Sequence, residues 1–91
     1  MVVVVVYVIA VYDVQADRTR LFRNYLRRFL IHVQNSVFEG EVTEGELERM
    51  RNDLEEMLAP GESTIIYAVS AESYVDRTVF GEDPTEDSQF L

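Results

Sequence analysis

The stretch VVVVVYVIAVYDV, residues 2–14, decides the fold of this chain. Valine, isoleucine and tyrosine favour strands, and here they occupy both odd and even positions. A strand that is apolar on both sides is typical of a central position in a sheet. The run ends at Asp13, its first ionised residue. We therefore predict a central strand over residues 2–12 that leads directly to one carboxylate.

Length and composition limit the protein class. Ninety-one residues make one small domain, and a second subunit is a natural way to complete the core of a chain this short. The sequence contains no cysteine, which excludes disulfides, thiolate metal sites and cysteine nucleophiles. The apolar run is shorter than the roughly 20 residues of a membrane span and follows no Lys or Arg. We expect a cytoplasmic protein without membrane contact.

The charge is strongly acidic and unevenly distributed. Seventeen acids face eight bases, all of them Arg, for a net charge of -9. A solvated acidic surface that maintains solubility is one explanation; adaptation to a high-salt cell interior is the other, which we favour. Residues 1–38 hold five arginines against two aspartates, a net +3, whereas residues 39–91 carry a net -12. The basic groups thus follow Asp13 closely.

Helical and strand patterns alternate along the rest of the chain. We predict a helix over 18–31 with Asp17 as its N-cap, because its apolar residues form one stripe and its arginines lie on the other side. Residues 32–42 are β-prone, as two short strands or one strand kinked at Asn35–Ser36. Thr43 and Glu46 form a capping box for a helix over 44–58. Strands are expected at 63–69 and 78–80. The predicted helix 18–31 buries Leu21, Phe22, Tyr25, Leu26, Phe29 and Leu30.

This order predicts an α+β fold, a ferredoxin-like split βαβ sandwich with an antiparallel sheet and both helices on one face. We place the domain at 1–81 and an acidic C-terminal tail at 82–91. The other face of the sheet would remain bare. A second copy packed sheet against sheet, as a two-fold homodimer, would cover it.

The sequence excludes several kinds of site. Four scattered glycines form neither a Walker motif nor a dinucleotide fingerprint. The single histidine, His32, lies near Ser36, but nothing marks a serine as an oriented nucleophile.

Asp13 has two interpretations. It caps the following loop or helix, as aspartate after a strand often does, or it binds a metal ion. One carboxylate holds Mg²⁺ (or Mn²⁺) weakly, but two copies facing each other across a dimer axis would make a bridging site. Such an ion polarises a phosphate and lowers the pKa of bound water.

Two polar groups could hold nucleic acid beside Asp13. Guanidinium groups fit phosphate well, and neutral amide and hydroxyl groups contact a sugar-phosphate backbone without reading bases. The predicted nucleic-acid-binding residues are Arg18, Arg20, Arg23, Arg27, Gln34 and Ser36.

Together these segments resemble one family. The strand YVIAVYDV, an arginine-bearing helix, the segment HVQNSVFEGEVT and an acidic helix are similar to Cas2, the small CRISPR-associated adaptation subunit. The resemblance covers residues 5–81, and the tail GEDPTEDSQFL also resembles a common ending in that family. Two features depart from the pattern: His32 stands where arginine often precedes V-Q, and the chain is unusually acidic.

The resemblance implies a ferredoxin-like homodimer in which a late strand of each chain joins the partner's sheet. It implies that Asp13 is the divalent-metal ligand, that Tyr12 and Phe38 belong to the catalytic site, and that Arg20 is the helix arginine used there. Members are described as metal-dependent endonucleases on RNA or DNA. The family dimer also bridges dimers of the Cas1 integrase, which inserts spacer DNA into the CRISPR array.

Three functions remain open at this stage. The chain is a DNA-bridging scaffold of spacer acquisition in antiviral defence, or a Mg²⁺-dependent phosphodiesterase acting on single-stranded RNA or double-stranded DNA. The third alternative is a ferredoxin-like regulatory or small-molecule-binding module without nuclease activity.

Overall fold

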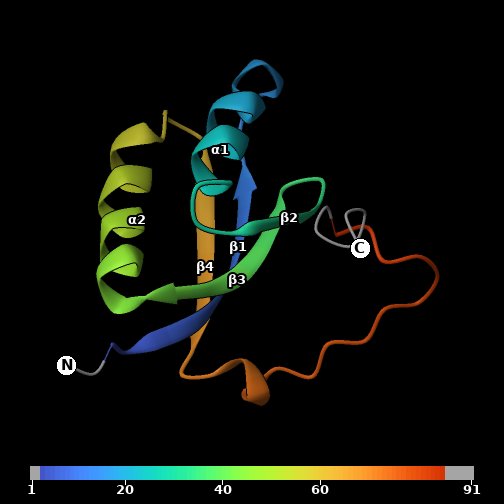
Figure 1. The fold of residues 1–91 in the computed structure, drawn as a ribbon. Coiled ribbons are helices and arrows are strands. Elements are labelled where there is room, and N and C mark those ends of the chain that lie inside the picture. Colours follow the sequence, from blue (N-terminus) through green and yellow to red (C-terminus); the bar gives the residue numbers. More distant parts are fainter. Residues whose placement is uncertain (1–2, 86–91) are drawn as a thin grey trace.

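A four-stranded antiparallel sheet in the order β2-β3-β1-β4 organises the computed structural model, which describes residues 3–85. Both α-helices cover one face of this sheet (Figure 1). This arrangement confirms the predicted ferredoxin-like α+β fold. The elements are β1 Val5–Asp13, η1 Ala16–Arg18, α1 Thr19–Leu26, β2 Ile31–Gln34, β3 Val37–Thr43, α2 Glu44–Met57, β4 Ser63–Val69 and η2 Glu72–Tyr74, where η marks a short 3₁₀-helix.

Strand β1 is central, as predicted, and its side chains alternate between the two faces. It pairs with β3 and β4 so that Ala10 lies opposite Phe38 on one side and Ile66 on the other. The even-numbered residues of β1 face the helices and form the core with α1 and α2. The buried core comprises Val8, Ala10, Tyr12, Phe22, Leu26, Leu30, Phe38, Val42, Leu47, Met50 and Leu54.

Helix α2 begins where the sequence predicts. The Glu46 amide donates to the Thr43 hydroxyl (3.0 Å), and the Thr43 amide donates to the Glu46 carboxylate (2.8 Å). This reciprocal capping box satisfies two amides that a helix start would leave unpaired. The helix buries Leu47, Met50 and Leu54 against the sheet.

Helix α1 is shorter than predicted, and Leu21, which was predicted to be buried, is 48% exposed. The helix covers residues 19–26 rather than 18–31, and Asp17 is not its N-cap, because Asp17 lies inside η1 and Arg18 occupies the cap position without a side-chain cap bond. After Leu26 the backbone tightens, and the Phe29 amide donates to the Leu26 carbonyl. The chain then enters β2, where Ile31 lies opposite Glu39. Residues from Ile31 onward therefore pair with β3 instead of continuing the helix.

Residues 31–43 form a hairpin of two strands, so the first of the two predicted alternatives is correct. Asn35 adopts φ +47° at the turn, a left-handed conformation that asparagine tolerates better than most residues. His32 Nε2 donates to the Asn35 carbonyl oxygen (2.8 Å) and steadies this turn.

The chain after β4 forms no strand at residues 78–80 within the part that the structure describes, contrary to the prediction. Instead, residues 70–85 run as a strap away from the sheet and back toward the β2–β3 hairpin (Figure 1). Residues 78–80 pair with no strand among the described residues. Residues 86–91 of the predicted acidic tail lie outside the described residues.

The sheet face opposite the helices exposes apolar side chains. We call this the open face; it carries Ile9 and Val11 of β1 beside Tyr67 and Ile65 of β4. Ile65 and Tyr67 are 50% and 58% exposed. Apolar side chains gathered on one face in this way are typical of an interaction surface. Among residues 3–85, no helix has the length and apolar content that crossing a bilayer requires.

Candidate metal and nucleic-acid site

Asp13 lies at the carboxyl end of β1, on the open-face side of the sheet. Its strand neighbour on β4 is Ser63, and its side chain is exposed. Within residues 3–85 the Asp13 carboxylate makes no hydrogen bond or ion pair, and neither η1 nor α1 has a side-chain cap. The capping interpretation of Asp13 is therefore wrong. This carboxylate is held out to solvent with its acceptor oxygens unused.

A different carboxylate ties down the loop after Asp13. The Ala59-Pro60-Gly61-Glu62 turn, closed by a bond from the Glu62 amide to the Ala59 carbonyl (3.0 Å), has Gly61 at φ +84°, which suits the third position of a type II turn. Glu62 accepts from the Gln15 amide (3.1 Å) and from Arg18 Nε (2.8 Å). Its other oxygen accepts from the Ala59 amide (2.8 Å).

Arg18 serves the fold rather than an exposed phosphate site. Besides its 2.8 Å ion pair with Glu62, its Nη2 donates to the Met57 carbonyl at the end of α2 (2.6 Å). Its guanidinium also lies over the Phe22 ring. Two of its donor nitrogens, Nε and Nη2, are thus already used inside the chain, and the assignment of Arg18 to nucleic-acid binding stays a prediction.

The remaining helix arginines lie on the surface of α1 and its C-cap. Arg20, Arg23 and Arg27 are exposed and follow one another at intervals of three and four residues, which places them along one side of a helix. Arg20 has no ion pair within the described part of the chain. The guanidinium of Arg28, which was not among the predicted site residues, lies 5.4 Å from the ring centroids of both Tyr25 and Phe29.

Tyr12 and Phe38 lie in the core, on the face opposite Asp13. Tyr12 is 5% exposed and Phe38 fully buried, and their ring centroids are 6.3 Å apart. Burial raises the pKa of the Tyr12 hydroxyl, so this phenol stays protonated at neutral pH and is a poor general base. The structure does not bring either side chain to the surface with Asp13. Both rings pack in the core, and the catalytic role that the resemblance implies for them stays a prediction.

Gln34 and Ser36 occupy the β2–β3 hairpin. Gln34 is exposed and lines a hollow with Arg77 and Phe80 of the strap. Ser36 is half-buried, and its carbonyl accepts from the Tyr12 amide (3.2 Å). The hairpin therefore meets β1 one residue before Asp13, and it brings Ser36 nearer to the carboxylate than sequence separation suggests.

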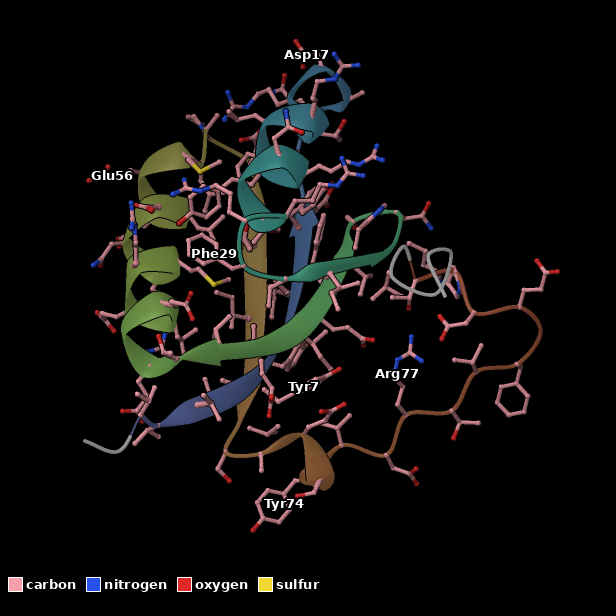
Figure 2. All side chains as sticks on the ribbon, viewed as in Figure 1. Tyr7, Asp17, Phe29, Glu56, Tyr74 and Arg77 are labelled. Atoms are coloured by element: carbon pink, nitrogen blue, oxygen red, sulfur yellow. The ribbon has the colours of Figure 1, made fainter. Side chains whose placement is uncertain are left out.

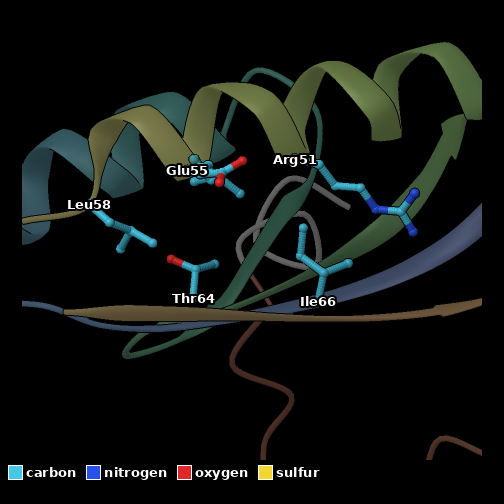
Figure 3. A pocket seen from close by; sticks show the side chains of 6 residues that line it. Arg51, Glu55, Leu58, Thr64 and Ile66 are labelled. Carbon is cyan, nitrogen blue, oxygen red and sulfur yellow. The ribbon is translucent and has the colours of Figure 1, made fainter. Parts of the chain in front are cut away.

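A groove runs between α2 and the free edge of β4 (Figure 3). Leu54, Leu58 and Ile66 make its apolar lining, and it encloses about 250 Å³. The Thr64 hydroxyl oxygen is buried there with no hydrogen-bond partner among the described residues. An unpaired strand edge beside an apolar groove is a surface to which another strand can add.

The family follows from comparison with known proteins. The chain matches the family model described as CRISPR associated protein Cas2 over residues 5–77. It belongs to the Cas2 family. A CRISPR-associated endoribonuclease Cas2 of Haloferax volcanii is 43% identical over 83 residues, which cover 91% of this chain and 96% of that protein. The Methanothermobacter thermautotrophicus relative of the same description is 45% identical over 80 residues, covering 87% and 88%.

Solved structures agree with this membership. A crystal structure of a Cas2 protein has a TM-score of 0.78 and 34% identity, and the match covers 87% of this chain and 90% of that one. A hypothetical protein, TT1823, from Thermus thermophilus has a TM-score of 0.69 and 31% identity, with coverage of 89% and 96%. The resemblance to the Cas2 family found in the sequence is confirmed.

One chain of this Cas2 protein supplies few metal ligands. Within residues 3–85 no group of three or more His, Cys, Asp or Glu side chains converges on a point. Mg²⁺ nevertheless binds through one or two carboxylates with water and phosphate oxygens as its other ligands. An exposed Asp13 without internal partners fits that requirement, and a second copy would add the second carboxylate.

Two charged clusters were missed in the sequence. Glu62 gave no signal, because its partner Arg18 is 44 residues away in the chain. Arg77 stands alone among many acids, and this isolation could have predicted that it is paired. It contacts Glu39 (2.7 Å) and Asp83 (3.1 Å) and donates to Thr85 (2.8 Å). Figure 2 shows its side chain directed from the strap back toward the sheet.

The Arg77 cluster also reaches β1. Tyr7 is buried on the strap side of the sheet, and burial together with its hydrogen bond to Glu39 raises the Tyr7 pKa to about 12. The Arg77 guanidinium holds the pKa of Asp83 well below its usual range. This network fastens the strap to β1 and β3.

Proposed function

We propose that this Cas2 chain is a metal-dependent endoribonuclease-type phosphodiesterase that acts as a homodimer in CRISPR adaptation. The observation that carries the proposal is the Asp13 carboxylate, exposed at the end of β1 with no partner among residues 3–85. The related proteins from Haloferax volcanii and Methanothermobacter thermautotrophicus are described as endoribonucleases. The regulatory-module alternative loses its support, since the chain belongs to a nuclease-named family.

Each residue has a defined part in this proposal. Asp13 would hold Mg²⁺ or Mn²⁺, which supplies polarisation of a scissile phosphate and an acidified water when bound. Arg20, Arg23 and Arg27 on the surface of α1 would contact flanking phosphates, and Gln34 and Ser36 would contact the backbone from the hairpin. Tyr12 and Phe38 would support β1 from the core so that Asp13 keeps its direction.

The open face supports a homodimer. Ile65 and Tyr67 are about half exposed beside Ile9 and Val11, and covering them with a second copy would remove apolar surface from water at about 25 cal/mol per Å². Because Asp13 stands at one end of this face, a two-fold axis through it would bring two such carboxylates toward one another. That arrangement would complete the metal site.

Strand exchange would add to this dimer. The β4 edge and the groove beneath α2 are open, while Phe80 of the strap is 92% exposed. Residues 78–80 have β-prone side chains but no partner strand within the described chain. Pairing of this segment with the partner's β4 would supply an edge and cover Phe80.

Replacing Asp13 with Asn tests the nuclease proposal directly. Labelled single-stranded RNA and double-stranded DNA are incubated with wild type, Asp13→Asn and the control Glu56→Gln, which alters an exposed glutamate of α2. We expect Mg²⁺- or Mn²⁺-dependent cleavage by wild type and Glu56→Gln. Asp13→Asn should lose more than a hundredfold in rate, since a bound cation contributes several kcal/mol. Equal cleavage by Asp13→Asn would contradict the proposal.

A scaffold role is the second function, favoured by the basic side of α1 and the two open protein surfaces. Here the dimer would bridge Cas1 integrase dimers and hold spacer-precursor DNA during insertion into the array. Spacer acquisition in cells that carry Asp13→Asn separates the two functions. Acquisition at the wild-type level with cleavage lost would support a scaffold whose nuclease is dispensable, whereas loss of both would tie acquisition to the carboxylate.

A further inference from the structure

The helical turns that follow Asp13 begin without a side-chain cap. Gln15 precedes η1, and neither it nor Arg18 contributes a side-chain cap to the turns that follow. The Gln15 backbone amide, two residues from Asp13, instead donates to Glu62 (3.1 Å). Asp13, Gln15 and Glu62 line the same surface hollow. The direction in which the loop leaves β1 is therefore set by a residue from the α2–β4 connection.

Glu62 is itself held rigidly. Its side chain is 2% exposed, and both carboxylate oxygens accept hydrogen bonds, from Gln15, Arg18 and Ala59. Arg18 extends the hold to the Met57 carbonyl at the end of α2. This pair thus links the Asp13 loop to a helix end and a tight turn, and a carboxylate bonded on both oxygens cannot rotate without losing several charge-assisted bonds.

We propose that Glu62 and Arg18 are a positioning pair for Asp13. Glu62 and Arg18 hold the loop after β1 in place through their hydrogen bonds. The Asp13 carboxylate is therefore not needed to hold this loop and remains available to a cation. The inference rests on the proposed function, since it assigns the pair a purpose only if Asp13 binds a cation. A displacement of about 1 Å at such a ligand is enough to reduce function strongly.

Removing a negative charge in one variant and a positive charge in another distinguishes positioning of Asp13 from a direct electrostatic effect on the bound cation. Glu62→Gln removes a negative charge near the cation, which on electrostatic grounds alone weakens binding; Arg18→Gln removes a positive charge, which alone strengthens it. Positioning predicts that both variants weaken binding. Gly61→Ala changes no charge, but it strains the turn that carries Glu62, because φ +84° is unfavourable for alanine. Gly61→Ala should therefore also weaken cation binding, as Glu62→Gln and Arg18→Gln do.

The test is Mn²⁺ titration of the folded, ¹⁵N-labelled protein, read as paramagnetic broadening of the Asp13–Gln15 amides. We expect Glu62→Gln and Arg18→Gln each to raise the half-maximal Mn²⁺ concentration about tenfold, Gly61→Ala to raise it less, and Glu56→Gln to leave it unchanged. Asp13→Asn should remove the saturable broadening. Circular dichroism melts identify any variant that is unfolded at the titration temperature, and Gly61→Ala is the mildest variant.

The outcomes separate the two proposals. If wild type shows broadening that Asp13→Asn does not remove, or none at all, the proposed metal function fails and the positioning pair fails with it. If Asp13→Asn removes the broadening while the folded Glu62, Arg18 and Gly61 variants titrate like wild type, only the positioning pair is overturned. Opposite shifts in Glu62→Gln and Arg18→Gln would assign their effect to charge and would also overturn it.

Discussion

Both faces of the sheet carry apolar side chains, but the helices cover only one of them. The helix face buries Phe22, Phe38 and Met50 completely within one chain. The open face leaves Ile65 and Tyr67 about half exposed, and it ends at the Asp13 carboxylate, which has no partner in the described part of the chain. Strand β1 contributes to both, with Tyr12 on one face and Asp13 on the other. A single strand therefore contributes its even residues to the core of one chain, and Ile9 and Val11 to the face that we propose for association.

This difference predicts that substitutions on the two faces affect different properties. Substitutions on the helix face should act on the unfolding free energy of each chain. Substitutions on the open face should act on association and, through it, on the shared site. The predictions below test that separation from the largest expected effect to the smallest.

Phe38→Ala should give the largest effect on folding. Removing a fully buried aromatic ring from the helix face leaves a cavity beside Tyr12 and His32. Such substitutions lower the free energy of unfolding by about 3–5 kcal/mol. Urea denaturation followed by circular dichroism measures the loss. Leu21→Ala, at a half-exposed position of α1, is the matched control and should cost far less. A Phe38 variant as stable as wild type would break the assignment of this ring to the core.

Tyr67→Glu should dissociate the dimer while preserving the fold. A carboxylate buried without a partner costs about 3–5 kcal/mol, so the dimer dissociation constant should rise at least about a hundredfold. Sedimentation velocity over a concentration series measures it. Leu21→Glu places the same charge on an exposed apolar site away from the open face and should remain dimeric. A dimer unaffected by Tyr67→Glu would mean that copies associate elsewhere.

Arg20→Ala should weaken nucleic-acid binding moderately. Arg20 is exposed and without an ion pair in the described chain, so its loss removes one phosphate contact per chain. The slope of log affinity against log salt should become less steep by about one to two, measured by fluorescence anisotropy with a labelled oligonucleotide. Arg51→Ala on α2, paired with Glu48, is the control. The same slope for both variants would remove Arg20 from the interface.

The smallest effect concerns pH. Hydrogen bonds from Arg18 chiefly lower the Glu62 pKa below its usual value near 4.5. A depressed carboxylate pKa contributes stability that is present above about pH 5 and is lost as pH falls through the folded-state value. Wild type and Glu62→Gln should therefore differ most in melting temperature near pH 7 and converge as pH falls through the folded-state pKa of Glu62. A difference that grew on acidification would contradict this ionised hydrogen-bonded state.

Much of the fold could be predicted because its signals are local. The capping box of Thr43 and Glu46 spans four residues, and the alternation of strand and helical patterns is visible within short windows. The end of α1 could not be predicted, because no Gly or Pro marks it and the competing interaction is the pairing of Ile31 with Glu39. The expected strand at 78–80 failed for a related reason, since a strand requires a partner edge that short windows do not reveal.

The site was predictable in part. Asp13 stood out because it ends an apolar strand, and its exposure agrees with that prediction. Arg18 and Arg20 look alike in sequence, but only Arg18 meets a carboxylate 44 residues later. Tyr12 was placed in the site with Asp13 by the family resemblance, whereas strand alternation sends the two side chains to opposite faces. A tertiary contact over a long sequence separation thus distinguishes the two arginines, whereas the local alternation of β1 distinguishes Tyr12 from Asp13.

The stoichiometry of Mn²⁺ binding tests the central claim most directly. Equilibrium dialysis of the wild-type protein should give one tightly bound Mn²⁺ for every two chains, because two Asp13 carboxylates share the ion across the dimer axis. Both Asp13→Asn and the dissociated Tyr67→Glu variant should lose this binding. One Mn²⁺ per chain, retained at full affinity by monomeric Tyr67→Glu, would contradict the account.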